Sequence, residues 1–133
     1  MAVKNILSKL RVDKNWVSVK LTENDFYLIA IKEEKDKRRD TIDSKDISRV
    51  IFEIGIDSGI KNSPLTIQYL TVNFEDITSG NNELNKITGF TRVLNFPKTF
   101  YIRPSSVIDK TGKAYKDGEV SISVNINEFD LGN

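Results

Sequence analysis

Apolar and polar side chains alternate along several segments of this chain, most regularly in residues 119–127. The apolar members of that segment occupy every second position: Val120, Ile122, Val124 and Ile126. Serines and asparagines fill the positions between them. Successive side chains of an extended chain point to opposite faces, so this pattern predicts a strand with one face on a core and one in water.

Further extended segments are expected at residues 16–21, 26–32, 46–56, 65–74, 88–96 and 99–103. In residues 46–56 the alternation favours a strand, although Asp46 could also cap a helical turn. The first two flank Thr-Glu-Asn-Asp at residues 22–25, whose side chains suit a turn, so residues 16–32 are predicted to form a hairpin.

The apolar residues expected to face inward in residues 65–74 change phase. They shift from Leu65, Ile67 and Tyr69 to Leu70, Val72 and Phe74. Such a shift predicts a β-bulge, because one extra residue reverses the face on which the later side chains lie.

The N-terminal segment has a different period. Its apolar residues fall at i, i+3, i+4 and i+7: Val3, Ile6, Leu7 and Leu10. This spacing predicts a short amphipathic helix within residues 1–12. A helix of about ten residues is not stable alone in water. Its apolar stripe is therefore expected to pack on the chain's own sheet or on a neighbouring subunit, and the four residues are candidate partner contacts.

Turn and loop signals separate the strands. Asp109 and Gly112 predict a tight turn between two short extended runs, and Asp117-Gly118 predicts another before the last strand. Pro97 cannot donate to a ladder and marks an edge or a corner between sheets. Residues 32–40 and 75–87 are expected to be loops, and residues 128–133 a loosely held tail.

These elements predict an all-β protein, built as an antiparallel β-sandwich, in a jelly-roll-like variant or otherwise, after a short helix. A partly open barrel is the second choice. Residues 1–12 form the helical arm in this interpretation, and residues 13–133 form one sandwich domain. Nothing in the composition divides the chain further.

The composition excludes several classes of function. The 133 residues contain no cysteine and no histidine, which removes thiolate chemistry, disulfides, the common zinc sites and the usual general base at neutral pH. A net charge of +1 does not suit a dedicated nucleic-acid binder. We find no apolar run near the roughly 18 residues that span a bilayer and no signal peptide. Together with the absence of cysteine, this fits a location in the cytoplasm of the producing cell, or in a particle assembled there and later released.

No motif for catalysis or cofactor binding is found. The close carboxylate pairs lie in or beside predicted turns, where solubility explains them, and the serines have no histidine to activate them. The spacing of Asp40, Asp43 and Asp46 does not match a calcium loop. We therefore expect no enzymatic activity, no metal and no cofactor.

Two groups of side chains remain as candidate ligand contacts. Four aromatic residues lie on or beside predicted strands and could stack on sugar rings or bases: Trp16, Tyr69, Tyr101 and Tyr115. Trp16 shares its face with Ser18 and Lys20, opposite the valines. A basic group within residues 32–40 could contact phosphate or an acidic surface: Lys37, Arg38 and Arg39.

In composition and strand pattern the chain resembles small structural proteins of tailed bacteriophage virions, such as capsid decoration, collar or tail components. That resemblance implies a non-enzymatic assembly protein that acts through contacts with other subunits, as a homo-oligomer or within a larger particle. Two other classes stay open: a carbohydrate-binding β-sandwich module that uses the aromatic residues, and a single-stranded nucleic-acid binder of the OB type that uses the basic group.

Overall fold

The computed structural model describes residues 3–7, 9–12, 15–33, 40–74, 88–116 and 118–128. These residues form strands and a single short 3-10 turn, η1 (Ser44–Asp46). The strands are β1 (Val3–Leu7), β2 (Leu10–Val12), β3 (Val17–Lys20), β4 (Phe26–Lys32), β5 (Ile47–Ile56), β6 (Leu65–Asn73), β7 (Thr88–Val93), β8 (Thr99–Asp109), β9 (Ala114–Tyr115), β10 (Gly118–Val120) and β11 (Ile122–Glu128).

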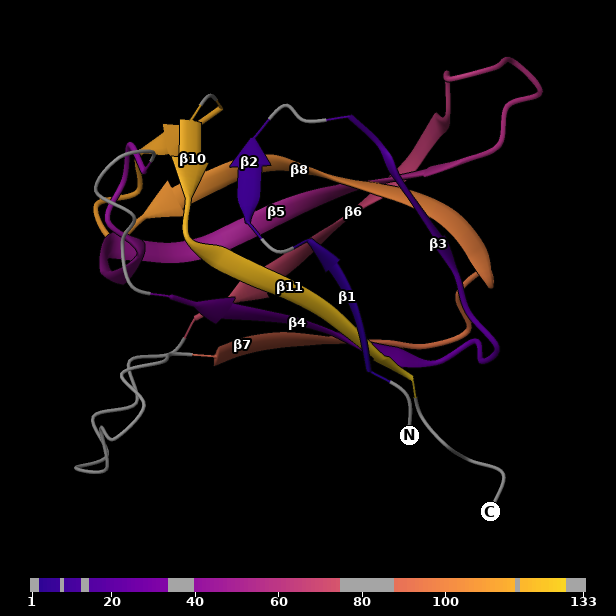
Figure 1. The fold of residues 1–133 in the computed structure, drawn as a ribbon, viewed down its shortest axis with the longest axis horizontal. Coiled ribbons are helices and arrows are strands. Elements are labelled where there is room, and N and C mark those ends of the chain that lie inside the picture. The colour runs from indigo at the N-terminus through magenta and orange to yellow at the C-terminus, as the bar shows by residue number, and fades with distance from the viewer. Residues whose placement is uncertain are drawn as a thin grey trace.

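The strands form two larger sheets and a small one, and all named strand pairs are antiparallel. The first sheet has the order β1-β11-β4-β7. The second has the order β3-β8-β5-β6, with β9 paired to β8. Strands β2 and β10 form the small sheet. Figure 1 shows β4, β7 and β11 as one layer and β5 and β8 as the other.

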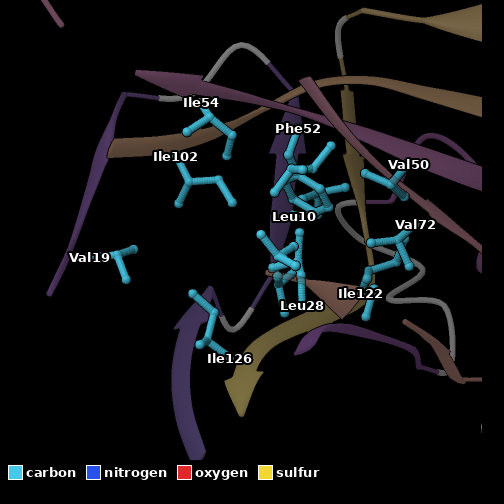
Figure 2. Close-up of a cluster of buried hydrophobic side chains, with 14 of the residues drawn as sticks. Leu10, Val19, Leu28, Val50, Phe52, Ile54, Val72, Ile102, Ile122 and Ile126 are labelled. Atoms are coloured by element: carbon cyan, nitrogen blue, oxygen red, sulfur yellow. The ribbon is translucent and has the colours of Figure 1, made fainter. Parts of the chain in front are cut away.

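One hydrophobic core lies between these layers. Strand β4 alternates buried and half-buried residues along its whole length, and β11 does the same. Figure 2 shows Leu28 and Ile122 of the first sheet in one cluster of buried side chains with Phe52 and Val72 of the second. Phe26 stacks on Phe100, and Phe96 meets both rings edge-on at centroid distances of 5.7 and 5.0 Å. The expected all-β, sandwich-like architecture is confirmed, as is the inward face of the last strand.

The predicted N-terminal helix is not seen, and this expectation is corrected. Residues 3–7 form β1 against β11, and residues 10–12 form β2 against β10. The register of β1 skips Ile6, so a bulge lets the consecutive Ile6 and Leu7 both pack against the core. Leu10 is fully buried. A bulge and a strand break therefore produced the spacing that resembles a helical stripe.

The hairpin predicted over residues 16–32 is also wrong. Strand β3 pairs with β8 in one sheet, whereas β4 pairs with β11 and β7 in the other. The segment between them crosses from sheet to sheet beside the segment that contains Pro97. Backbone hydrogen bonds join these two segments. Leu21 N–H donates to the Lys98 carbonyl oxygen at 2.7 Å, and Phe96 N–H donates to the Asn24 carbonyl oxygen at 2.9 Å. The expectation of a corner at Pro97 is confirmed.

Other local predictions have mixed outcomes. A bulge is present in residues 65–74, where the register of β6 on β5 skips Ile67, but it does not lie at the predicted change of phase between Tyr69 and Leu70, where the pairing continues unbroken. The expectation that Leu65, Ile67 and Tyr69 face inward is wrong, because all three are exposed. The tight turn before β9 is confirmed, with Gly112 at a φ of +92°. The tail prediction is wrong at Glu128, which is buried at the end of β11. Most of the two predicted loops, residues 34–39 and 75–87, lies outside the described residues.

Candidate interaction surfaces

The outer face of the second sheet carries a connected row of polar and aromatic side chains. Trp16, directly before β3, lies under the guanidinium of Arg103 on β8, whose Cζ is 4.2 Å from the centroid of the indole ring. Arg103 Nε donates to Glu53 Oε1 of β5 at 2.8 Å. Glu53 Oε2 accepts a hydrogen bond from the Thr66 hydroxyl of β6. These contacts therefore link side chains across four adjacent strands of the sheet, from the start of β3 through β8 and β5 to β6.

Glu53 is the centre of this row. Burial raises the pKa of its carboxyl group, but the hydrogen bonds from Arg103 and Thr66 and the charge of Arg103 outweigh burial. The net result is a pKa below the ordinary value of 4.5. Glu53 is thus ionised at neutral pH, and it holds Arg103 over the Trp16 ring.

A pocket of about 540 Å³ lies beside this row. Its walls come from the segment before β3, the β5–β6 turn and β8: Asn15, Trp16, Asp57, Ile60, Asn62, Ser63, Pro64, Tyr101 and Arg103. Gly55 permits this packing, because a Cβ there would lie 2.9 Å from Pro64 Cβ and 3.1 Å from the Trp16 ring. The missing side chain brings Trp16 and Pro64 down onto the sheet.

The β5–β6 turn, residues 57–64, is held by its own hydrogen bonds. Asp57 Oδ1 accepts from Gly59 N–H at 2.9 Å, and Ser58 Oγ donates to the Ser63 carbonyl oxygen at 2.5 Å. Gly59 and Asn62 have positive φ angles of 83° and 61°, which glycine and asparagine tolerate best. The turn therefore presents its side chains to the pocket from a fixed backbone.

The same hairpin carries exposed apolar side chains. We call Leu65, Ile67 and Tyr69, the exposed apolar residues of β6 at the projecting end of the β5–β6 hairpin, the apolar arm (Figure 1). Their exposed fractions lie between 40% and 59%. Ile60 of the adjoining turn is 68% exposed and lines the pocket beside Trp16. Strand β6 is an edge strand without a charged residue, whereas the other edge strands of the two larger sheets, β1, β3 and β7, each carry a lysine or an arginine.

A second apolar surface lies on the outer face of the first sheet. Phe90 of β7 is 63% exposed, and its ring meets the Tyr27 ring of β4 edge-on at 5.5 Å. Ile29 and Thr88 complete a shallow pocket of about 220 Å³ with these two rings, which we call the Phe90 pocket. Figure 1 places β4 and β7 in the layer opposite the β5–β6 hairpin. The apolar arm and the Phe90 pocket are therefore separate surfaces.

The structure brings together two of the four predicted aromatic residues. Trp16 and Tyr101 line one pocket, whereas Tyr69 lies further along the same sheet, paired with Glu53 in the ladder. Tyr115 is elsewhere, where its hydroxyl donates to Asp109 Oδ2 at 3.0 Å.

The structure describes only one of the two other predicted groups of contact residues. The basic group Lys37, Arg38 and Arg39 lies outside the described residues. In the expected partner stripe, Leu10 is fully buried and Ile6 and Leu7 pack on the core, so these three belong mainly to the interior. Val3 lies in β1.

Several residues of these surfaces were missed from the sequence. Arg103 and Glu53 are 50 positions apart, and nothing local in either strand indicates that they pair. Ile60 and Asn62 lie between the predicted strands 46–56 and 65–74, and nothing in that segment indicates a pocket. A usable signal was present in β6, where no charged residue protects a predicted strand that contains three apolar side chains of one phase.

Two features are absent from the described part of the chain. No group of three or more acidic side chains there could hold a metal ion. No helix there has the length and apolar character needed to cross a membrane.

Comparison with known proteins gives no relative. No family model, no curated protein and no solved structure matches the chain.

Proposed function

We propose that this protein is a non-enzymatic structural protein that assembles through contacts between copies of itself. The observation that carries the proposal is the apolar arm, whose large apolar side chains project into solvent on an edge strand that has no charge. Soluble proteins usually blunt such edges with charges, prolines or short strands. Clustered exposed apolar side chains of this kind typically mark a protein interface.

The Phe90 pocket of a second copy is the proposed partner of the arm. It is lined by two aromatic rings and Ile29, and it offers apolar contact to an aliphatic side chain such as Ile67. Arm and pocket are different surfaces of one chain, so their contact is heterologous. Repeating a heterologous contact produces a ring if the rotation closes and a filament if it does not.

A repeating assembly of this kind suits a virion component. We therefore keep the proposal that the chain is a decoration, collar or tail protein of a bacteriophage particle, in a jelly-roll-like sandwich. The support for that more specific proposal is the resemblance in composition and strand pattern described above. The support for self-assembly is the arm itself.

Light scattering after size exclusion, over a range of concentrations, tests the assembly. Wild-type protein is expected to form species larger than the 15.1 kDa chain. The double variant Leu65→Lys/Ile67→Lys is expected to be monomeric, because burying an unpaired charge against the Phe90 pocket is unfavourable. Leu94→Lys is the matched control, since Leu94 is 50% exposed and lies in neither surface. A wild-type chain that stays monomeric at every concentration would contradict the proposal.

A mixing experiment tests the partner. Phe90→Lys removes the pocket but keeps the arm, whereas the arm variant keeps the pocket. Each variant alone is expected to be monomeric, and their mixture is expected to form a one-to-one dimer through the one intact contact. If the mixture stays monomeric while wild-type protein assembles, the arm does not dock on the Phe90 pocket.

A further inference from the structure

The pocket beside Trp16 has the composition of a ligand site, and assembly through the arm does not account for it. We propose that it binds a neutral saccharide, with one sugar ring held against Trp16 and Tyr101. Its volume of about 540 Å³ falls in the range of small-molecule sites, roughly 300–1,000 Å³.

The aromatic part of the pocket suits the apolar face of a sugar. A pyranose ring exposes C–H groups on its faces and hydroxyl groups around its edge. Trp16 and Tyr101 supply aromatic surface that can pack against such C–H groups. Tyr101 is half-buried on β8 and is paired with Ser18 and with Gly55, over which the Trp16 ring packs, so the two aromatic residues lie near each other on one face of the sheet.

The polar part suits the hydroxyl edge. Asn15, Asn62 and Ser63 bring two amides and a hydroxyl, which can both donate and accept hydrogen bonds. Asp57 adds a carboxylate that uses Oδ1 on the turn backbone. This mixture of donors and acceptors matches a ring of hydroxyl groups, each of which can also donate and accept.

The charges disfavour the other ligand classes that stack on aromatic rings. Arg103 is the cation of the pocket and is already paired with Glu53, while Asp57 repels an anion. A phosphate or a nucleic-acid backbone would therefore lack the unpaired basic groups that supply its affinity. A fully apolar ligand would leave the amides without hydrogen-bond partners.

The site is organised before any ligand arrives. The Trp16 ring is fixed by Arg103 above it and by Gly55 and Pro64 at its edge. The turn that carries Asp57 and Asn62 is closed by its own hydrogen bonds. Side chains that are already ordered lose little conformational entropy on binding, which favours affinity in a shallow site.

The fluorescence of Trp16 provides a direct test, because it is the single tryptophan of the chain. The probes are neutral monosaccharides and their disaccharides, titrated into the full chain: glucose, galactose, mannose and N-acetylglucosamine. At least one is expected to change the Trp16 emission saturably, and the same sugar is expected to be retained on a glycan array. If no sugar of the set changes the emission and the array shows no binding, the proposal is wrong.

Three variants locate the binding. Tyr101→Ala is expected to weaken binding about tenfold, by loss of the stacking surface. Asn62→Gly keeps the positive φ and removes only the amide, so it is expected to weaken binding severalfold without a change in stability. Tyr69→Ala is the matched control, an exposed tyrosine of the same sheet outside the pocket, and is expected to bind like wild type. Equal loss in all three variants, or no loss in the first two, would overturn this location.

The two proposals fail separately. Leu65→Lys/Ile67→Lys changes the arm but no pocket residue, so it is expected to bind sugar normally while it fails to assemble. Asn62→Gly is expected to assemble normally but to bind sugar more weakly than wild type.

Discussion

The backbone oxygen of Asn73 occupies the space that a side chain on Gly89 would need. A Cβ on Gly89 would lie 2.4 Å from that oxygen and 2.9 Å from Val72 Cγ1. The contact lies where the two larger sheets approach one another, since Phe74, the residue after β6, forms a bridge with Gly89 of β7. Glycine at this position lets β6 and β7 close one side of the core.

Gly89→Ala is therefore expected to destabilise the protein by about 1–3 kcal/mol, the usual cost of overpacking a tight site. The clash is with backbone, which cannot rotate away as a side chain could. Urea denaturation followed by circular dichroism measures the change. Thr88→Ala, at an exposed neighbouring position, is the control and is expected to stay within about 0.5 kcal/mol of wild type.

A second prediction concerns Leu10. It is fully buried and lies opposite Val120 in the small sheet. Leu10→Ala is expected to cost about 2–5 kcal/mol, as for other large-to-small changes in a core. Ile6→Ala, at a half-buried position in the bulge of β1, is expected to cost clearly less. Equal small effects at both positions, measured by denaturation, would indicate that residues 3–12 lie on the surface as an amphipathic segment.

The faces of individual strands could be predicted from the sequence, whereas their partners could not. In β11 the alternation of apolar and polar residues reflects local geometry, and each of its predicted core residues is buried. The turn between β3 and β4 could be predicted from its composition, but the chain continues from this turn into the opposite sheet instead of forming a hairpin. Which strand a segment pairs with depends on contacts distant in sequence, such as that of β3 with β8, and no local pattern encodes them.

The candidate site was predictable to a similar extent. Trp16 could be assigned to the outer face because Ser18 and Lys20 share its side of the strand. The contact of Trp16 with Arg103 could not be predicted, because it depends on the pairing of β3 with β8. The N-terminal segment failed for a different reason. A bulge at Ile6 gives two adjacent residues the same inward face, and the resulting spacing matches a helical stripe.

A third prediction concerns Glu128, a buried carboxyl group at the end of β11. Its Oε1 accepts from Thr22 N–H at 3.0 Å, and its Oε2 accepts from the Thr22 hydroxyl. These bonds tie β11 to the segment that crosses between the sheets. Glu128→Ala is expected to lower the free energy of unfolding by about 1–3 kcal/mol, because the Thr22 N–H and hydroxyl lose their hydrogen-bond acceptor. Glu128→Gln keeps an acceptor oxygen and is expected to lose less in the same denaturation experiment. A neutral alanine variant would contradict a structural role for the contact.

The last prediction uses the lowered pKa of Glu53. The folded protein holds this carboxyl ionised more strongly than the unfolded chain does, so the unfolded chain binds more protons in acid. The stabilisation by Glu53 is therefore fully present above the ordinary pKa of 4.5 and is lost as the pH falls through the lower folded value. Glu53→Gln is expected to reduce stability at neutral pH by about 1 kcal/mol, because the pair with Arg103 is only partly buried.

The comparison of wild type with Glu53→Gln isolates this group from Asp109. A hydrogen bond from the Thr111 hydroxyl, outweighing the effect of desolvation, lowers the pKa of Asp109 as well. Asp109 titrates in both proteins, so its contribution cancels in the difference between their stabilities. That difference is expected to shrink below pH 4.5, while the wild-type Trp16 emission shifts toward that of the variant as Arg103 loses its anchor. A stability difference that stays constant through the acid range would show that the Arg103–Glu53 ion pair does not stabilise the fold.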